Sequence, residues 1–261
     1  MESATVDAYL QRMGTKRPAR LDLAALRELQ ERHIMSIPFE MFDFNLKKPI
    51  ALGEGAVRKF LDQHRGGGCY ELNSAFATLL RALGFKVAVL GGRVLHNGRQ
   101  AVHGALNGHM ALCVEIDGTK WLSDVGFRWA SRHPLRFDVR GEQDDPHGTY
   151  QIVHTHEGDA ELVQNGVPRY RLEMRARELD DFMPTLWWFI HAPDSPTADS
   201  RWASLVLPNG RVSLLDRRLT RWENGAKTRE EHLADDEDFL RAMKDCFGIE
   251  LDRVPELRTT Q

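Results

Sequence analysis

The fold is decided by the stretch Arg65-Gly66-Gly67-Gly68-Cys69-Tyr70-Glu71-Leu72-Asn73, in which a run of glycines leads to a cysteine. Helical spacing continues up to Gly84 in the apolar residues Leu72, Phe76, Leu79, Leu80 and Leu83. Glycine allows the backbone to approach a neighbour or a ligand closely. A thiol in the first turn of a helix lies near the positive end of the helix dipole, which favours the nucleophilic thiolate. The stretch therefore predicts a reactive Cys69, and the alternative is a packed, inert cysteine before a core helix.

The composition of the chain excludes several functional classes. With 261 residues, of which 42% are hydrophobic and 28% charged, it is expected to form one or two globular domains. Its net charge of -3, without a long basic block, argues against nucleic acid or a membrane surface as a partner. We find neither a signal-peptide pattern nor an apolar run that could span a membrane. The three cysteines Cys69, Cys113 and Cys246 predict no disulfide framework, which suits a reducing cytoplasm.

The order of the predicted elements indicates an α+β fold rather than alternating βαβ units. The hydrophobic pattern is helical over residues 1–85 and has a period of two from residue 86 onward. Strands are predicted at 86–90, 93–95, 109–116, 119–125, 135–139, 149–155, 160–164, 169–177, 202–207 and 211–215. A terminal helix is predicted over 229–247, and the apolar run 184–190 is given no type. We expect three units, at 1–85, 86–190 and 191–261.

A hairpin with the turn Asp117-Gly118 carries the second group of candidate residues. Asp-Gly is a strong signal for a two-residue hairpin loop, which would pair Ile116 with Thr119. In this register Glu115 lies opposite Lys120, and the opposite charges support the pairing.

The same register places His109 and Asp124 on one face as diagonal neighbours, about 7–8 Å apart at the backbone. A hydrogen bond to the carboxylate would fix the tautomer of the histidine and stabilise its imidazolium form. A slip by one residue would put the two side chains on opposite faces. The pattern suggests that Cys69 is a nucleophile, His109 its base and Asp124 the orienting carboxylate. The alternative is an ordinary His–Asp pair, because sequence spacing alone does not bring the hairpin to Cys69.

Four short motifs follow one another over residues 37–127. They are Ile37-Pro38-Phe39-Glu40, the stretch from Arg65 to Asn73, His109-Met110, and Asp124-Val125-Gly126-Phe127. In this order they resemble the IPFE, RGGxCxExN and HM…DVGF motifs of the arylamine N-acetyltransferase family. Beyond about residue 130 only the length and general character are similar.

The resemblance implies both a fold and an activity. The fold would be a helical N-terminal domain carrying the nucleophile, a central antiparallel β-barrel-like domain carrying His109 and Asp124, and a C-terminal α/β lid, around a cysteine-protease-like Cys-His-Asp core. The activity would be acetyl transfer from acetyl-coenzyme A to an arylamine, arylhydrazine or N-hydroxyarylamine. Transfer would follow a ping-pong cycle through a thioester on Cys69.

The resemblance also implies binding residues. Phe39 and Phe127 match positions that line the acceptor pocket, which suits a flat aromatic amine. Gly126 matches a position near the thioester end of the coenzyme. Arg65 and Glu40 resemble a structural ion pair. The expected partners are therefore a small aromatic amine or hydrazine and an acyl-coenzyme A, and no feature of the sequence specifies an oligomeric state.

The chain departs from the family pattern after the DVGF motif. Arg128 stands where the family usually has glycine, and its cation could narrow the coenzyme entrance or reach the phosphates. Gly108 precedes His109 where threonine is common. Another acyl-coenzyme A donor, an amide synthase of the same family, and a cysteine hydrolase or transglutaminase-like enzyme with the same triad remain alternatives.

Other candidate residues are given a structural interpretation. His154 and His156 alternate like two metal ligands on a strand, but we interpret them as exposed strand residues and expect no metal. Cys113 is interpreted as a small core residue. The run Trp187-Trp188-Phe189 is interpreted as core rather than as a stacking platform, since no basic groove accompanies it.

Overall fold

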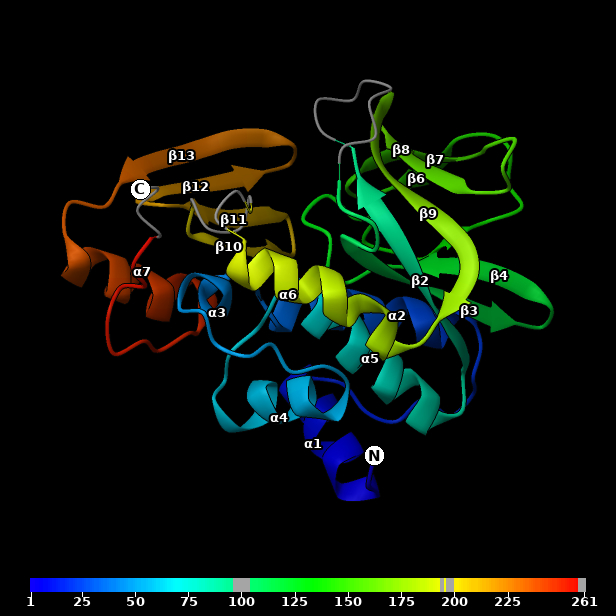
Figure 1. Ribbon diagram of the computed structural model, residues 1–261, viewed down its shortest axis with the longest axis horizontal. Coiled ribbons are helices and arrows are strands. Elements are labelled where there is room, and N and C mark those ends of the chain that lie inside the picture. The colour runs from blue at the N-terminus through cyan, green and yellow to red at the C-terminus, as the bar shows by residue number, and fades with distance from the viewer. Residues whose placement is uncertain (96–103, 193–194, 196–199, 258–261) are drawn as a thin grey trace.

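The computed structural model describes residues 1–95, 104–192, 195 and 200–257, and it confirms the predicted α+β fold (Figure 1). Two sheets lie beside each other, and most of the helices gather on one side of them. The active-site candidates come from the helical part and from the larger sheet, so the packing between these two parts decides the geometry of the site.

The N-terminal part of the chain is helical, as predicted. Its helices are α1 (Ser3–Arg12), α2 (Leu23–Ser36), α3 (Phe42–Asn45), α4 (Glu54–Asp62) and α5 (Cys69–Leu83). Leu72, Phe76 and Leu79 on α5 are completely buried in the core that these helices share. Burial of such side chains contributes about 1.5–3 kcal/mol each to folding, which anchors α5 firmly. Gly84 ends the helix in the left-handed conformation, with φ of 107°.

The larger sheet is antiparallel, curls toward a barrel, and has the strand order β5-β4-β3-β2-β9-β8-β7-β6. Its strands are β2 (Lys86–Val94), β3 (His109–Ile116), β4 (Thr119–Ser123), β5 (Leu135–Arg136), β6 (Gln143–Asp145), β7 (Gly148–His154), β8 (Ala160–Gln164) and β9 (Val167–Arg177). Successive residues of β3 face opposite sides of the sheet. Leu112 and Val114 pack on the helices, whereas Ala111 and Cys113 belong to the core inside the barrel. Cys113 is thus a core residue, as predicted.

The smaller sheet joins the N-terminal and C-terminal parts of the chain. Its order is β1 (Phe39–Glu40), β10 (Trp202–Leu207), β11 (Gly210–Leu215), β12 (Arg218–Glu223) and β13 (Ala226–His232). Phe39 on β1 lies opposite Ser204 on β10. Helix α7 (Asp236–Phe247) packs Phe239 and Met243 against this sheet. The division into units that end near residues 85 and 190 stays a prediction.

The apolar run that had no assigned type is helical. It forms α6 (Met183–His191), which follows the short 3-10 helix η2 (Leu179–Phe182). Only Leu186 and Ile190, one turn apart, are buried in the core. The prediction that Trp187 belongs to the core was wrong, because this side chain is 64% exposed. The apolar residues surround α6 on all sides, so they cannot all face the same core.

Two predicted elements, a helix and a strand, need correction. The helix expected over 229–247 begins only at Asp236, because residues 226–232 form β13, which pairs with β12 in an unpredicted hairpin. The residues of β13 are mostly exposed and show no apolar alternation. The overlooked signal is the turn Asn224-Gly225, with φ of 50° and 80°.

The strand expected to break around Gly91-Gly92 is continuous. β2 runs through both glycines, with a register shift against β9 between Leu90 and Gly92. A Cβ atom on Gly91 would lie 2.1 Å from Oδ1 of Asn107, and one on Gly92 would lie 2.9 Å from the carbonyl oxygen of Arg171. These glycines therefore permit close packing within a strand.

A buried group of charges supports the segment before Cys69. Lys59 Nζ lies 2.6 Å from Asp43 Oδ2, 2.7 Å from Glu71 Oε1 and 3.5 Å from Glu40 Oε1. Arg65 donates a hydrogen bond to Glu40 at 2.8 Å, so the expected ion pair between these residues is confirmed. Burial opposes the charge on Lys59, but the surrounding carboxylates outweigh it and raise the pKa of Lys59.

We expect Lys59→Met to lower the free energy of unfolding by about 3–5 kcal/mol, because it leaves the buried carboxylate of Glu71 without its cation, whereas Glu40 keeps Arg65. Urea unfolding followed by circular dichroism measures this loss. Lys86→Met is the matched control, since Lys86 pairs with Glu115 at 3.4 Å but its side chain is 80% exposed. The control should lose about 1 kcal/mol or less. Equal losses for the two variants would contradict the structural role of Lys59.

Candidate active site

The glycine run places Cys69 by packing closely against its surroundings. A Cβ atom on Gly66 would lie 1.8 Å from the carbonyl oxygen of Pro38, and one on Gly67 would lie 2.5 Å from Oε2 of Glu71. Side chains at these positions would push the run away from the rest of the helical part. Cys69 is the first residue of α5, as predicted, and its side chain is partly exposed.

The β3–β4 hairpin has the predicted register. Glu115 lies opposite Lys120, and Asp117-Gly118 forms the turn with φ of 49° and 77°. His109 begins β3, and Asp124 directly follows β4. The two side chains meet as expected, with His109 Nε2 2.8 Å from Asp124 Oδ2, and both are buried.

Two further groups hold the carboxylate of Asp124. Asn73 Nδ2 and the backbone nitrogen of Gly126 each donate a hydrogen bond to Asp124 Oδ1 at 2.9 Å. Burial opposes ionisation, but His109 and these hydrogen bonds outweigh it and hold the pKa of Asp124 below its ordinary value. Sequence reasoning assigned no role to Asn73, although residues four apart, such as Cys69 and Asn73, share one face of a helix.

Aromatic rings and charges fix the state of His109. Its ring lies 5.3 Å from the ring of Phe127 and 4.7 Å from that of Tyr170, measured between centroids. Because Nε2 faces Asp124, Nδ1 is the nitrogen left for Cys69. Burial disfavours the imidazolium, but the charge and hydrogen bond of Asp124 and a hydrogen bond with Cys69 raise the pKa of His109 to about 10. The histidine can therefore keep a proton next to the sulfur.

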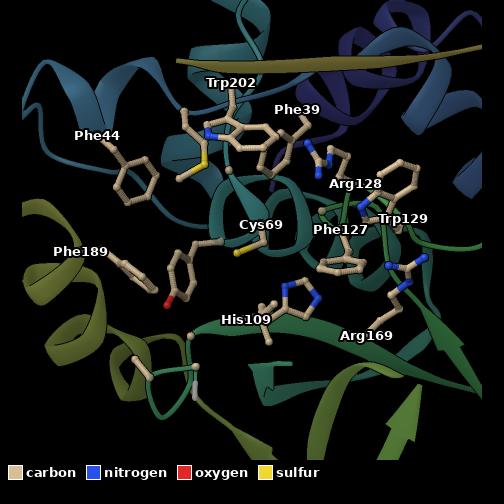
Figure 2. Close-up of a pocket in the computed structure, with 18 of the residues that line it drawn as sticks. Phe39, Phe44, Cys69, His109, Phe127, Arg128, Trp129, Arg169, Phe189 and Trp202 are labelled. Atoms are coloured by element: carbon tan, nitrogen blue, oxygen red, sulfur yellow. The ribbon is translucent and has the colours of Figure 1, made fainter. Parts of the chain in front are cut away.

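Cys69 and His109 face a cavity of about 770 Å³, in the range of small-molecule sites (Figure 2). All four predicted binding residues line it: Phe39, Gly126, Phe127 and Arg128. The lining residues that sequence reasoning missed include Phe44, Tyr70, Trp129, Arg169, Trp188, Phe189 and Trp202. They come from α3, α5, α6, β9, β10 and the chain after β4, so no local pattern connects them.

Gly126 packs directly against the nucleophile candidate. A Cβ atom at this position would lie 2.6 Å from Cα of Cys69 and 2.6 Å from Nδ2 of Asn73. Glycine is therefore required here for close contact between the chain after β4 and the start of α5. This contact holds the β3–β4 hairpin next to α5, a proximity that the sequence spacing alone could not predict.

Arg128 stacks against aromatic rings at the wall of the cavity. Its guanidinium carbon lies 4.9 Å from the ring centre of Trp129 and 4.2 Å from that of Trp202. Figure 2 shows Arg128, Trp129 and Arg169 together on the side of the cavity opposite Phe189. The wall next to Phe127 is thus both aromatic and cationic.

Neither a metal site nor a membrane span emerges from the described residues. Within these ranges no three His, Cys, Asp or Glu side chains gather in a way that could hold a metal ion. The interpretation of His154 and His156 as exposed strand residues was wrong: His154 ends β7 half-buried, with Nε2 2.8 Å from the carbonyl oxygen of Phe137, and His156 lies in the turn after that strand. None of the helices in the same ranges combines the length and apolar character that crossing a bilayer would require.

Comparison with known proteins places this geometry in a family. A family model described as N-acetyltransferase matches residues 22–255. The chain is 30% identical to an arylamine N-acetyltransferase of Escherichia coli (strain K12), over 94% of this chain and 88% of the relative.

Solved structures agree with the sequence comparison. The arylamine N-acetyltransferase from Salmonella typhimurium superposes with a TM-score of 0.89 at 26% identity, covering 100% of this chain and 96% of the other. The Mycobacterium marinum arylamine N-acetyltransferase in complex with CoA superposes with a TM-score of 0.86 at 26% identity, covering 94% and 92% of the two chains. The similarity therefore extends over the helices and both sheets.

Proposed function

Because the chain belongs to the arylamine N-acetyltransferase family, we propose that it transfers an acetyl group from acetyl-coenzyme A to an arylamine, arylhydrazine or N-hydroxyarylamine through a thioester on Cys69. The protein is an acyltransferase. The observation that carries the proposal is the hydrogen-bonded pair of His109 and Asp124 beside Cys69, at one cavity with aromatic walls.

In the first half of the cycle Cys69 takes the acetyl group. With the thiol proton held on Nδ1 of His109, the sulfur of Cys69 attacks the carbonyl carbon of the acetyl thioester. A new C–S bond forms to Cys69 while the C–S bond to the coenzyme breaks. The leaving coenzyme thiolate takes the proton from His109, and free coenzyme A departs.

In the second half the acetyl group moves to the acceptor. The nitrogen of the amine attacks the acetyl-Cys69 carbonyl, and His109 accepts the proton that the nitrogen releases. The C–S bond breaks, the amide leaves, and the thiolate of Cys69 remains next to the imidazolium of His109. Asp124 stabilises this imidazolium and holds the ring in place through both halves.

The cavity walls suit these substrates. Phe39 and Phe127 offer flat apolar surfaces to an aromatic amine. Trp202 of β10 lines the same cavity, so the C-terminal part of the chain covers the side opposite His109 (Figure 2). Such cover protects a thioester from water, as an α/β lid would.

We also propose the cytoplasm as the location, because a free catalytic thiol is favoured by a reducing compartment. Small molecules rather than nucleic acid or membranes are the proposed partners, in keeping with the negative net charge of the chain.

Steady-state kinetics with acetyl-coenzyme A and an aniline test the proposed cycle. We expect the N-acetylated aniline as product and parallel lines in double-reciprocal plots when one substrate is varied at several fixed levels of the other, as a ping-pong cycle requires. Intersecting lines would contradict the acetyl-enzyme. Release of acetate without amide would instead favour a cysteine hydrolase with the same three residues.

Gly126→Ala is expected to displace Cys69 and to lower kcat/KM for acetyl transfer about 100-fold, the effect of misplacing a reacting group by about 1 Å. The same kinetic assay measures this fall, and circular dichroism checks the fold. Gly141→Ala is the matched control, because a Cβ atom on Gly141 would meet nothing within 4 Å. Unchanged kinetics for Gly126→Ala would show that its contact with Cys69 does not position the sulfur.

A further inference from the structure

Three arginines surround the indole of Trp129. The guanidinium carbons of Arg128, Arg169 and Arg211 lie 4.9, 5.5 and 4.9 Å from the centre of the ring. Arg169 comes from β9 and Arg211 from β11, whereas Arg128 and Trp129 follow β4. The fold therefore gathers three cations from separate parts of a chain whose net charge is negative.

These cations are not neutralised by the described part of the protein. No Asp or Glu oxygen of a described residue lies within 4.0 Å of a nitrogen of Arg128, Arg169 or Arg211. Arg169 donates a hydrogen bond to Oε1 of Gln164 at 3.0 Å. Nη1 of Arg211 is completely buried and has no hydrogen-bond partner among the described residues. A buried cationic donor without an acceptor is costly to the folded state, and an anion bound at this position would remove that cost.

The electrostatics of the cluster favour the binding of an anion. Burial, together with the charge of Arg169, lowers the pKa of Arg128 to about 10. Burial likewise lowers the pKa of Arg211 to about 10, and the charge of Arg128 adds to this effect. Arginine normally stays charged inside proteins, and each guanidinium offers paired donors that match a phosphate.

The cluster lies where three hollows meet. Arg128, Trp129 and Arg169 line the cavity that contains Cys69. Trp129, Arg169 and Arg211 line a second hollow of about 570 Å³, which also contains Trp222. Arg128, Trp129 and Arg211 line a third of about 280 Å³. A ligand that is too large for the cavity of Cys69 can therefore extend past the arginines into the two neighbouring hollows.

We propose that Arg128, Arg169 and Arg211 bind the phosphate groups of the acyl-coenzyme A donor, with its thioester end at Cys69. This inference rests on the proposed function. A carboxylate on the acyl group or on the amine would neutralise one guanidinium, whereas the several phosphates of a coenzyme A match three. The same residues explain why a cation can follow the DVGF motif in this chain, since Arg128 forms one side of the phosphate site.

Arg211→Met tests this proposal, because Arg211 does not line the cavity of Cys69 and cannot act on the acetyl end directly. The variant is compared with the wild type using two donors, acetyl-coenzyme A and the phosphate-free thioester S-acetyl-N-acetylcysteamine. We expect the ratio of kcat/KM for the first donor to kcat/KM for the second to fall about 10- to 100-fold, mainly through KM for acetyl-coenzyme A. Arg175→Met, which removes an exposed arginine from β9, should leave this ratio unchanged.

The outcomes separate the phosphate site from the proposed function. An unchanged ratio in Arg211→Met, or an equal loss with both donors, would overturn the phosphate site and leave the acyltransferase intact. A loss confined to acceptors that carry a carboxylate would also overturn it and would indicate a carboxylate site. If neither donor acetylates Cys69 in the wild type, the proposed function itself fails.

Inhibition of the wild type by inorganic pyrophosphate tests the same proposal if Arg211→Met does not fold. Inorganic pyrophosphate should compete with acetyl-coenzyme A and raise its KM, but it should not raise KM for S-acetyl-N-acetylcysteamine. Absence of competition with acetyl-coenzyme A, or equal inhibition with both donors, would overturn the proposal.

Discussion

Replacement of Cys69 by alanine is expected to abolish acetyl transfer, with a fall in kcat of at least about 10⁴-fold. The sulfur is the atom to which the acetyl group is bound between the two half-reactions, and no neighbouring group can replace it. The fold should survive, because Cys69 is partly exposed and alanine is an excellent helix former. Turnover of acetyl-coenzyme A with an aniline gives the rate, and thermal unfolding checks the stability.

The other two cysteines provide the control for this variant. Cys246→Ala changes a thiol on α7, and Cys113→Ala changes one in the core inside the barrel. Neither residue lines the cavity of Cys69, so we expect Cys246→Ala to retain the wild-type rate. Cys113→Ala should lose some stability because it removes buried volume. Substantial turnover by Cys69→Ala would remove Cys69 as the nucleophile.

Asp124→Asn is expected to lower kcat by about 10³–10⁴-fold with little change in shape. Asn73 and the backbone of Gly126 both donate to Oδ1, so this atom must stay an oxygen. The amide nitrogen of the new side chain would then face Nε2 of His109. Its N–H groups would require Nε2 to act as an acceptor, which puts the ring proton on Nδ1 and leaves no base for Cys69.

The pH dependence of the rate distinguishes this effect from simple unfolding. The carboxylate of Asp124 is a main cause of the raised pKa of His109, which is about 10 in the wild type. Asp124→Asn removes that charge, so the pKa of His109 should fall and the imidazolium should be lost at lower pH. The alkaline limb of the kcat/KM profile should therefore move toward lower pH. Asp117→Asn, in the hairpin turn, is the matched control and should change neither rate nor profile, because asparagine tolerates its φ of 49°.

The part of the site that the sequence predicted depends on local rules. The Asp117-Gly118 turn fixes the hairpin, and the period of two then determines that His109 and Asp124 share a face. The register predicted from Glu115 and Lys120 is confirmed by the structure. The helix that begins at Cys69 could be predicted for the same reason, since helical spacing and the C-terminal glycine act within one element.

The features of the site and the fold that the sequence did not predict depend on contacts between distant elements. Gly126 meets the backbone of Cys69 only because the barrel packs on α5. Trp202 reaches the cavity from β10, and Arg211 reaches Trp129 from β11. The β12–β13 hairpin was missed because its strands are largely exposed and charged, so they lack an apolar pattern. Such features follow from tertiary packing, which overrides local propensity.

Whether Cys69 carries the acetyl group can be determined from the mass of the intact protein after acetyl-coenzyme A is added without an acceptor. The proposed mechanism predicts a gain of one acetyl group, located on the peptide that contains Cys69 and absent from Cys69→Ala. It also predicts that addition of an aniline returns the protein to its original mass. An unmodified protein that nevertheless acetylates the aniline, or a stable acetyl group on a residue other than Cys69, would contradict the mechanism.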